Sequence, residues 1–172
     1  MTRQQQLLKA VPDVLRYHTL LYVGASQRRQ HMLPLFTNRG YTITVLEAWH
    51  RNAVYVAKHV AGVNRVMCGD VRSTARLNLG PHDVVMWWHG PEHIHAQDLA
   101  PTLAALEELA LHVVVLASPW GRYDQDAVDG NPYERHLCAI YPDMLQDLGY
   151  KTSTLGKIDV KGSNLVAWRH TR

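Results

Sequence analysis

The stretch Leu20-Leu21-Tyr22-Val23-Gly24-Ala25-Ser26 decides the fold that we predict for this chain. Four apolar residues lead directly into a glycine, a pattern typical of a buried strand that ends in a tight turn. Towards the C-terminus, further short apolar runs alternate with amphipathic stretches typical of helices. Such alternation indicates βαβ units, and therefore a parallel sheet with helices on both faces.

The pattern predicts an α/β fold: a Rossmann-like, doubly wound sheet of five parallel strands plus a C-terminal antiparallel pair. The last two strands are joined by a connection too short for a crossover helix, so we expect them to be antiparallel. The predicted strands are residues 19–23, 42–46, 65–68, 83–88, 112–117, 151–155 and 164–168. The predicted helices are residues 28–38, 51–59, 98–110 and 142–148; residues 1–17 should lead into the sheet, with a helix over 5–17.

The composition is that of an ordinary globular chain. Its 172 residues, 47% hydrophobic and 19% charged, exclude collagen-like, low-complexity and fully disordered chains. We find no repeat and no linker, and therefore treat residues 1–172 as a single domain. The apolar runs are far shorter than the roughly 20 residues that span a bilayer, and the polar start lacks a signal-peptide core. We expect a cytoplasmic protein without a membrane partner.

The charge and the cysteine content also bear on the class of protein. The formal net charge is +3, and the basic residues are scattered along the chain rather than gathered in one block. Such scatter is typical of a solvated surface, although it leaves a nucleic acid or an anionic substrate open. Cys68 and Cys138 are too few for a disulfide scaffold, and we interpret both as small buried side chains.

Candidate ligand contacts follow the first three predicted strands. In an open parallel sheet, ligands bind beyond the carboxyl ends of the strands, where the strand order reverses. Gly24 follows the first strand, and Glu47 follows the second at about the 20-residue offset where nucleoside-binding domains place an acid for ribose hydroxyls. Asp70 follows the third strand and can accept from an adenine amino group, while the amide of Val71 donates to the ring. Trp49 can stack on a purine or belong to the core.

These strand ends resemble those of the class I S-adenosylmethionine-dependent methyltransferases, and the resemblance extends from Leu20 to Trp168. It implies S-adenosyl-L-methionine as cofactor and methyl transfer to an unidentified acceptor: a small molecule, a protein or a nucleic acid. The chain departs from the family at Tyr22, where an acid is usual, and at Ser26 and Arg28, where glycines are usual. The cofactor-binding residues that the resemblance implies are Tyr22, Gly24, Ala25, Ser26, Glu47, Ala48, Trp49, Asp70, Val71, His89 and Gly90.

The segment His89-Gly90-Pro91-Glu92-His93 spells H-x-x-E-H, an inverted zinc-protease pattern. That pattern requires a helix, which Gly90-Pro91 disfavours because proline costs about 3 kcal/mol in a helix interior. We therefore predict no metal and place the segment in a loop after the fourth strand. There, His89, Glu92 and His93 are the candidate catalytic residues. His136 is a further candidate base.

Segments further along the chain are similar to a group of small methyltransferase-like prokaryotic sequences. They are Ser118-Pro119-Trp120-Gly121 and Gly130-Asn131-Pro132-Tyr133-Glu134-Arg135-His136, together with the His89–His93 loop. We interpret residues 119–132 as a long loop that acts as a lid or binding segment. With little chain beyond the fold, the loops, the N-terminal helix or a second subunit must select the acceptor, which leaves a homo-oligomer open.

Two other function classes stay open. A non-catalytic protein can keep this fold to bind S-adenosylmethionine or a nucleoside, or to act as a scaffold, and Tyr22 in place of the usual acid motivates that alternative. An NAD-dependent oxidoreductase is disfavoured, because the chain lacks GxGxxG and its predicted sheet ends in an antiparallel pair.

Overall fold

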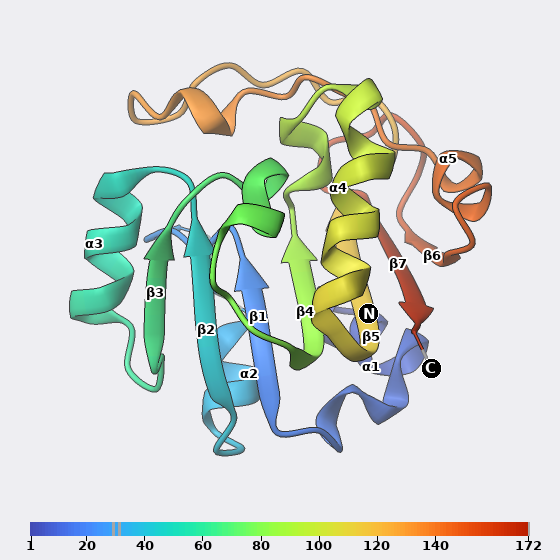
Figure 1. Cartoon of the computed structure of the whole chain (residues 1–172). Coiled ribbons are helices and arrows are strands. Elements are labelled where there is room, and N and C mark those ends of the chain that lie inside the picture. Colours follow the sequence, from blue (N-terminus) through green and yellow to red (C-terminus); the bar gives the residue numbers. More distant parts are fainter. Residues whose placement is uncertain (29, 31, 172) are drawn as a thin grey trace.

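The computed structural model describes residues 1–28, 30 and 32–171, and within them seven strands form one sheet in the order β3-β2-β1-β4-β5-β7-β6 (Figure 1). Strands β1 to β5 are parallel, whereas β7 is antiparallel to both of its neighbours, β5 and β6. This arrangement confirms the predicted fold class. The strands are β1 (Thr19–Val23), β2 (Thr42–Glu47), β3 (Arg65–Cys68), β4 (His82–Trp88), β5 (Ala110–Ser118), β6 (Lys151–Leu155) and β7 (Asn164–His170).

Helices cover both faces of the sheet, as predicted (Figure 1). Side chains of β1 alternate between two hydrophobic clusters: Leu20 and Tyr22 pack with α1, α2 and α3, whereas Leu21 and Val23 pack with α4 and α5. None of the described helices is long and apolar enough to cross a membrane. The helices are α1 (Arg3–Ala10), α2 (Leu33–Thr37), α3 (His50–His59), α4 (Ala96–Leu109) and α5 (Pro142–Gln146), with 3₁₀ turns η1 (Pro12–Leu15), η2 (Val71–Arg76), η3 (Pro91–His93) and η4 (Pro132–Glu134).

The predicted N-terminal helix over 5–17 is wrong in its extent. The chain forms α1 and then the separate turn η1, with Val11 between them at φ −131° and ψ 72°. Pro12 explains the break, because its ring disfavours a helical conformation in the preceding residue and it has no N–H to donate.

Two further expectations need correction. The predicted helix over 28–38 is reduced to the short α2, and Arg29 and His31 lie outside the described residues. Cys68 is exposed and Cys138 is only partly buried, contrary to the expectation that both are buried. Cys68 is exposed because it ends β3, which lies at the edge of the sheet.

The register brings the carboxyl ends of the central strands to one edge of the sheet. Val23 of β1 is paired with Leu46 of β2 and with Trp87 of β4, so the residues that follow these positions emerge side by side. The backbone N–H of Gly24 donates to the carbonyl of Leu46 at 2.9 Å and closes the turn after β1. Residues 119–140 cross above this edge (Figure 1).

Candidate active site

A cavity of about 90 Å³ lies at the carboxyl ends of β1, β2, β3 and β4, and it brings most of the predicted cofactor-binding residues together. Asn131, from the predicted lid or binding segment, also lines it, as do Tyr133 and Glu134, which the sequence did not indicate as cofactor contacts. The amide oxygen of Asn131 accepts from the backbone N–H of Tyr133 at 3.0 Å and shapes that turn. The predicted residues that line the cavity are Gly24, Ser26, Glu47, Ala48, Asp70, Val71, His89, Gly90 and His93.

Four predicted site residues lie outside this lining. Tyr22 packs in the core with 1% of its surface exposed, because alternate strand residues face opposite sides and its neighbour Val23 faces the cavity. Ala25 is fully buried. Trp49 lines an adjacent cavity of about 510 Å³, and Glu92 lines a third cavity of about 300 Å³.

Gly24 adopts the left-handed backbone conformation that glycine favours, with φ +79°. A β-carbon at this position would meet no atom within 4 Å. The turn after β1 therefore leaves open space directly above its backbone, on the cavity side. A ligand can approach the main chain closely there.

Glu47 is a buried carboxylate at the end of β2, with 6% of its surface exposed. Its Oε1 accepts the backbone N–H of Trp49 at 2.9 Å and lies 3.5 Å from the side-chain amide of Asn52. Burial, and to a smaller extent the nearby charge of Glu134, raise the pKa of Glu47. These hydrogen bonds and one from the backbone of Ala25 lower it, and the resulting pKa is about 7. The carboxylate is fixed in place and can accept two hydroxyl hydrogens from a ligand.

The carboxylate of Asp70 has contacts within the protein that the sequence did not indicate. Its carboxylate caps η2 by accepting the backbone N–H of Arg72 at 2.9 Å, and it also pairs with the Arg72 guanidinium at 2.6 Å. The hydrogen bonds from Arg72 outweigh burial and lower the pKa of Asp70. Arg72 also reaches Asp98 on α4 at 3.4 Å. The carboxylate is thus held at the rim of the cavity, where its contact with an adenine amino group stays a prediction.

Gly90 has a packing role that the sequence analysis did not find. A β-carbon at this position would collide with the indole ring of Trp87. The loop after β4 therefore turns directly against that ring, and only glycine fits. Its backbone still lines the cavity.

Glu92 lies in the turn η3, which follows β4, and only 2% of its surface is exposed. Its Oε1 is 3.3 Å from Nδ1 of His89 and 3.8 Å from Nε2 of His93. Burial alone would raise the pKa of Glu92, but the hydrogen bond from His89 and the charges of both histidines outweigh it and lower the pKa to about 2. The predicted catalytic residues His89, Glu92 and His93 therefore form one connected cluster.

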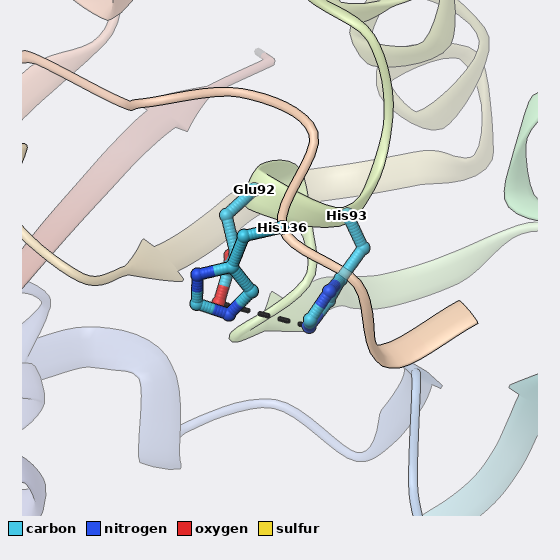
Figure 2. Close-up of side chains that lie close together, drawn as sticks. All are labelled: Glu92, His93 and His136. Atoms are coloured by element: carbon cyan, nitrogen blue, oxygen red, sulfur yellow. Dashed lines mark ion pairs between the residues drawn. The ribbon is translucent and has the colours of Figure 1, made fainter. Parts of the chain in front are cut away.

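His136 joins this cluster from the segment above the sheet (Figure 2). Its ring lies 4.9 Å from that of His93, in an edge-on arrangement. The approach is enforced by the backbone, because the carbonyl of Glu92 accepts the N–H groups of Leu137 at 2.8 Å and Cys138 at 3.2 Å. His136 is one of the predicted bases, but no sequence pattern indicates this long-range contact.

The three cavities adjoin one another around this cluster. His89 lines both the 90 Å³ cavity and the 300 Å³ cavity, whose lining also includes Tyr123 and His136. Ser26 is shared by the 90 Å³ and the 510 Å³ cavities. Two ligands can therefore occupy neighbouring spaces and meet at His89.

The strand order, the glycine turn after β1, the acid that ends β2 and the acid that follows β3 define the class I S-adenosylmethionine-dependent methyltransferase fold. No protein-family model and no curated protein sequence matches the chain. Solved structures do match it, although at 11–12% identity for the three described next they show the fold alone.

One is the N-methyltransferase NodS from Bradyrhizobium japonicum, with a TM-score of 0.67 and 11% identity, covering 97% of this chain and 92% of that chain. Another is magnesium protoporphyrin IX methyltransferase from Synechocystis with bound SAH, with a TM-score of 0.63 and 12% identity, covering 97% and 80%. A third, from Rhodobacter sphaeroides, is described as a putative Zn-dependent alcohol dehydrogenase; it has a TM-score of 0.67 and 12% identity, covering 98% and 90%.

Proposed function

We propose that this chain is a methyltransferase that uses S-adenosyl-L-methionine and transfers its methyl group to an acceptor in the adjoining cavity. The observation that carries the proposal is the convergence of Gly24, Glu47 and Asp70 on one cavity that ends at His89. The matching methyltransferase from Synechocystis, which was crystallised with bound SAH, supports the choice of cofactor.

Different residues of the cavity lining contact different parts of the cofactor in this proposal. The open backbone at Gly24 passes beneath the cofactor, and the buried carboxylate of Glu47 accepts both ribose hydroxyls. Asp70 accepts from the adenine amino group, while the amide of Val71 donates to the ring. The methionine part of the cofactor would then lie towards His89, which also lines the 300 Å³ cavity that would take the acceptor.

Methyl transfer is an in-line displacement, so the site contributes mainly by orienting the acceptor in a dry cavity. An acceptor lone pair forms the new bond to the methyl carbon, while the carbon–sulfur bond breaks and its electron pair stays on sulfur, giving S-adenosylhomocysteine. Where the acceptor loses a proton, His89 receives it. Glu92 accepts from Nδ1–H of His89 and so leaves Nε2 as the basic nitrogen.

Calorimetry with S-adenosylmethionine, S-adenosylhomocysteine and NAD tests the cofactor. We expect the first two to bind and NAD not to bind. Glu47→Ala should weaken binding by roughly 2–3 kcal/mol, because two charge-assisted hydrogen bonds are lost. Equal affinity of wild type and Glu47→Ala would remove the basis for this assignment.

A second candidate function, binding of S-adenosylmethionine without methyl transfer, is favoured by Tyr22. Its side chain lies in the core, so β1 presents no acid to the methionine amino group from that position. Turnover with candidate acceptors separates the two functions. For the enzyme, we expect His89→Ala to leave cofactor affinity within about tenfold, or 1.4 kcal/mol, while it lowers turnover.

A further inference from the structure

Glu92, His93 and His136 bring one carboxylate and two imidazoles together from two distant segments of the chain. One ligand atom from each residue lies within 4.8 Å of the others, and the dashed line in Figure 2 marks the contact between Glu92 and His93. Glu92 is 2% exposed, and its Oε2 has no hydrogen-bond partner among the described residues. A buried anion with an unsatisfied oxygen normally signals a missing partner.

The backbone fixes which nitrogen each imidazole presents. Nδ1 of His93 lies 3.1 Å from the carbonyl oxygen of Arg135, and Nδ1 of His136 contacts the carbonyl oxygen of Tyr123. A carbonyl oxygen only accepts, so each Nδ1 carries the hydrogen and each Nε2 presents its lone pair. Metal-binding histidines are oriented in this way, by an outer carbonyl or carboxylate on the second nitrogen.

We propose that Glu92, His93 and His136 bind a divalent transition-metal ion, of which Zn²⁺ is the representative probe. Two imidazole nitrogens and one carboxylate oxygen form the donor set of three-ligand catalytic zinc sites, which keep one position open. With bonds of about 2.0–2.1 Å, tetrahedral ligand atoms lie roughly 3.3 Å apart. Nε2 of His93 and Oε1 of Glu92 are already 3.8 Å apart. Side-chain rotations would complete the site, and His89, whose Nδ1 lies 3.3 Å from Oε1, would orient the carboxylate so that Oε2 is left for the ion.

This proposal departs from the expectation of no metal, which rested on Gly90-Pro91 disfavouring the helix that the H-x-x-E-H pattern requires. The proposed ligands are instead adjacent residues of one turn, plus His136 from the segment above. Glu92 and His136 line the 300 Å³ cavity, and His93 lines the 90 Å³ cavity. The ion therefore lies where acceptor and cofactor meet. Its role, which rests on the proposed function, is to bind an oxygen or nitrogen of the acceptor and favour its deprotonated form.

The test uses the full chain, purified without an affinity tag and stripped with a chelator. Calorimetry with Zn²⁺ should give one ion per chain, and Co²⁺ should give the visible absorption bands of a low-coordinate site. We expect His136→Ala to weaken Zn²⁺ binding by roughly 100-fold or more, because loss of a ligand exceeds the 10–100-fold effect of outer residues. His136→Asp, which restores a ligand atom, should recover part of the affinity.

His59→Ala is the matched control, since His59 is an exposed histidine at the end of α3, and it should bind Zn²⁺ like wild type. Circular dichroism of each variant verifies the fold. If wild type binds no stoichiometric Zn²⁺, or if wild type and His136→Ala bind Zn²⁺ with equal affinity, the proposed metal site is wrong. S-Adenosylhomocysteine binding is measured on the same samples, so that loss of the metal site and failure of the proposed function give different results.

Discussion

Nδ1 of His89 lies 3.3 Å from Oε1 of Glu92, and His89 makes this contact from a left-handed backbone conformation, φ +52°. A non-glycine residue adopts this conformation at an energetic cost, which persists only where the surroundings enforce it. The backbone N–H of His89 also donates to the carbonyl of Ala117 at 2.8 Å. The end of β4 therefore holds a strained backbone in order to aim one imidazole at a buried carboxylate.

This strain predicts an order of stability for two substitutions at position 89. Both His89→Ala and His89→Gly remove the imidazole, but only alanine keeps a β-carbon that opposes the left-handed backbone. We expect His89→Gly to be more stable by roughly 1 kcal/mol, since the cost of 1–2 kcal/mol for the β-carbon exceeds the extra unfolded-state entropy of glycine. Urea denaturation of the two variants measures the difference. A more stable alanine variant would show that the turn relaxes.

Glu47 makes stability depend on pH. Its folded pKa of about 7 lies above the ordinary value of 4.5, so between these values the folded state holds a proton that the unfolded state has released. Stability is therefore lost as pH rises from about 4.5 to 7, by an amount of the order of 3 kcal/mol. The glutamine of Glu47→Gln has no proton to lose. Between pH 5 and pH 8, the free energy of unfolding of this variant should therefore rise relative to that of wild type. Parallel pH profiles of the two proteins would contradict the assignment.

Gly24 and Gly40 form a matched pair for testing the cofactor turn. Both have positive φ, +79° and +72°, and a β-carbon at either position would meet no atom within 4 Å. Each alanine variant should therefore lose about 1 kcal/mol of stability through backbone strain alone. Only Gly24 lines the cavity, so we expect Gly24→Ala alone to weaken S-adenosylhomocysteine binding, by tenfold or about 1.4 kcal/mol at least. If calorimetry finds that both variants bind S-adenosylhomocysteine with equal affinity, Gly24 does not contact the cofactor.

Gly90→Ala should destabilise the protein more than either of those variants. Its β-carbon would enter the space of the Trp87 indole, and overpacking of a core typically costs about 1–3 kcal/mol. Thermal unfolding measures the loss. In the Trp87→Leu background the side chain at position 87 is smaller. Gly90→Ala should therefore lower the stability less in that background than it does in wild type. An additive double variant would mean that the two positions do not interact.

The sheet could be predicted from the sequence because strand periodicity and burial are local signals. The predicted bounds of β1, β3 and β6 agree with the structure. Gly24, Glu47 and Asp70 could be placed together for the same reason, since parallel strands end at one edge. The turn η2 was missed because it depends on the side chain of Asp70, which caps it.

The rest of the site depends on contacts between distant segments. Arg72 could not be assigned to both Asp70 and Asp98 without knowing where α4 packs. His136 reaches Glu92 only because backbone hydrogen bonds join Leu137 to the turn after β4. No periodicity encodes such pairings, so a sequence can supply the residue types of this cluster but not its assembly.

The position of β7 between β5 and β6 constrains the order in which the sheet assembles. Within the described sheet, β6 pairs only with β7, so it joins as one arm of a hairpin that docks on the open edge of β5. That hairpin is also tied to the other end of the chain, because Gln6 of α1 donates to the carbonyl of Ser153 and accepts from Asn164, both at 2.8 Å. Folding must therefore bring together residues some 150 positions apart, and contacts of such high sequence separation slow folding. Until then, β5 presents an unpaired edge on which another chain can template aggregation.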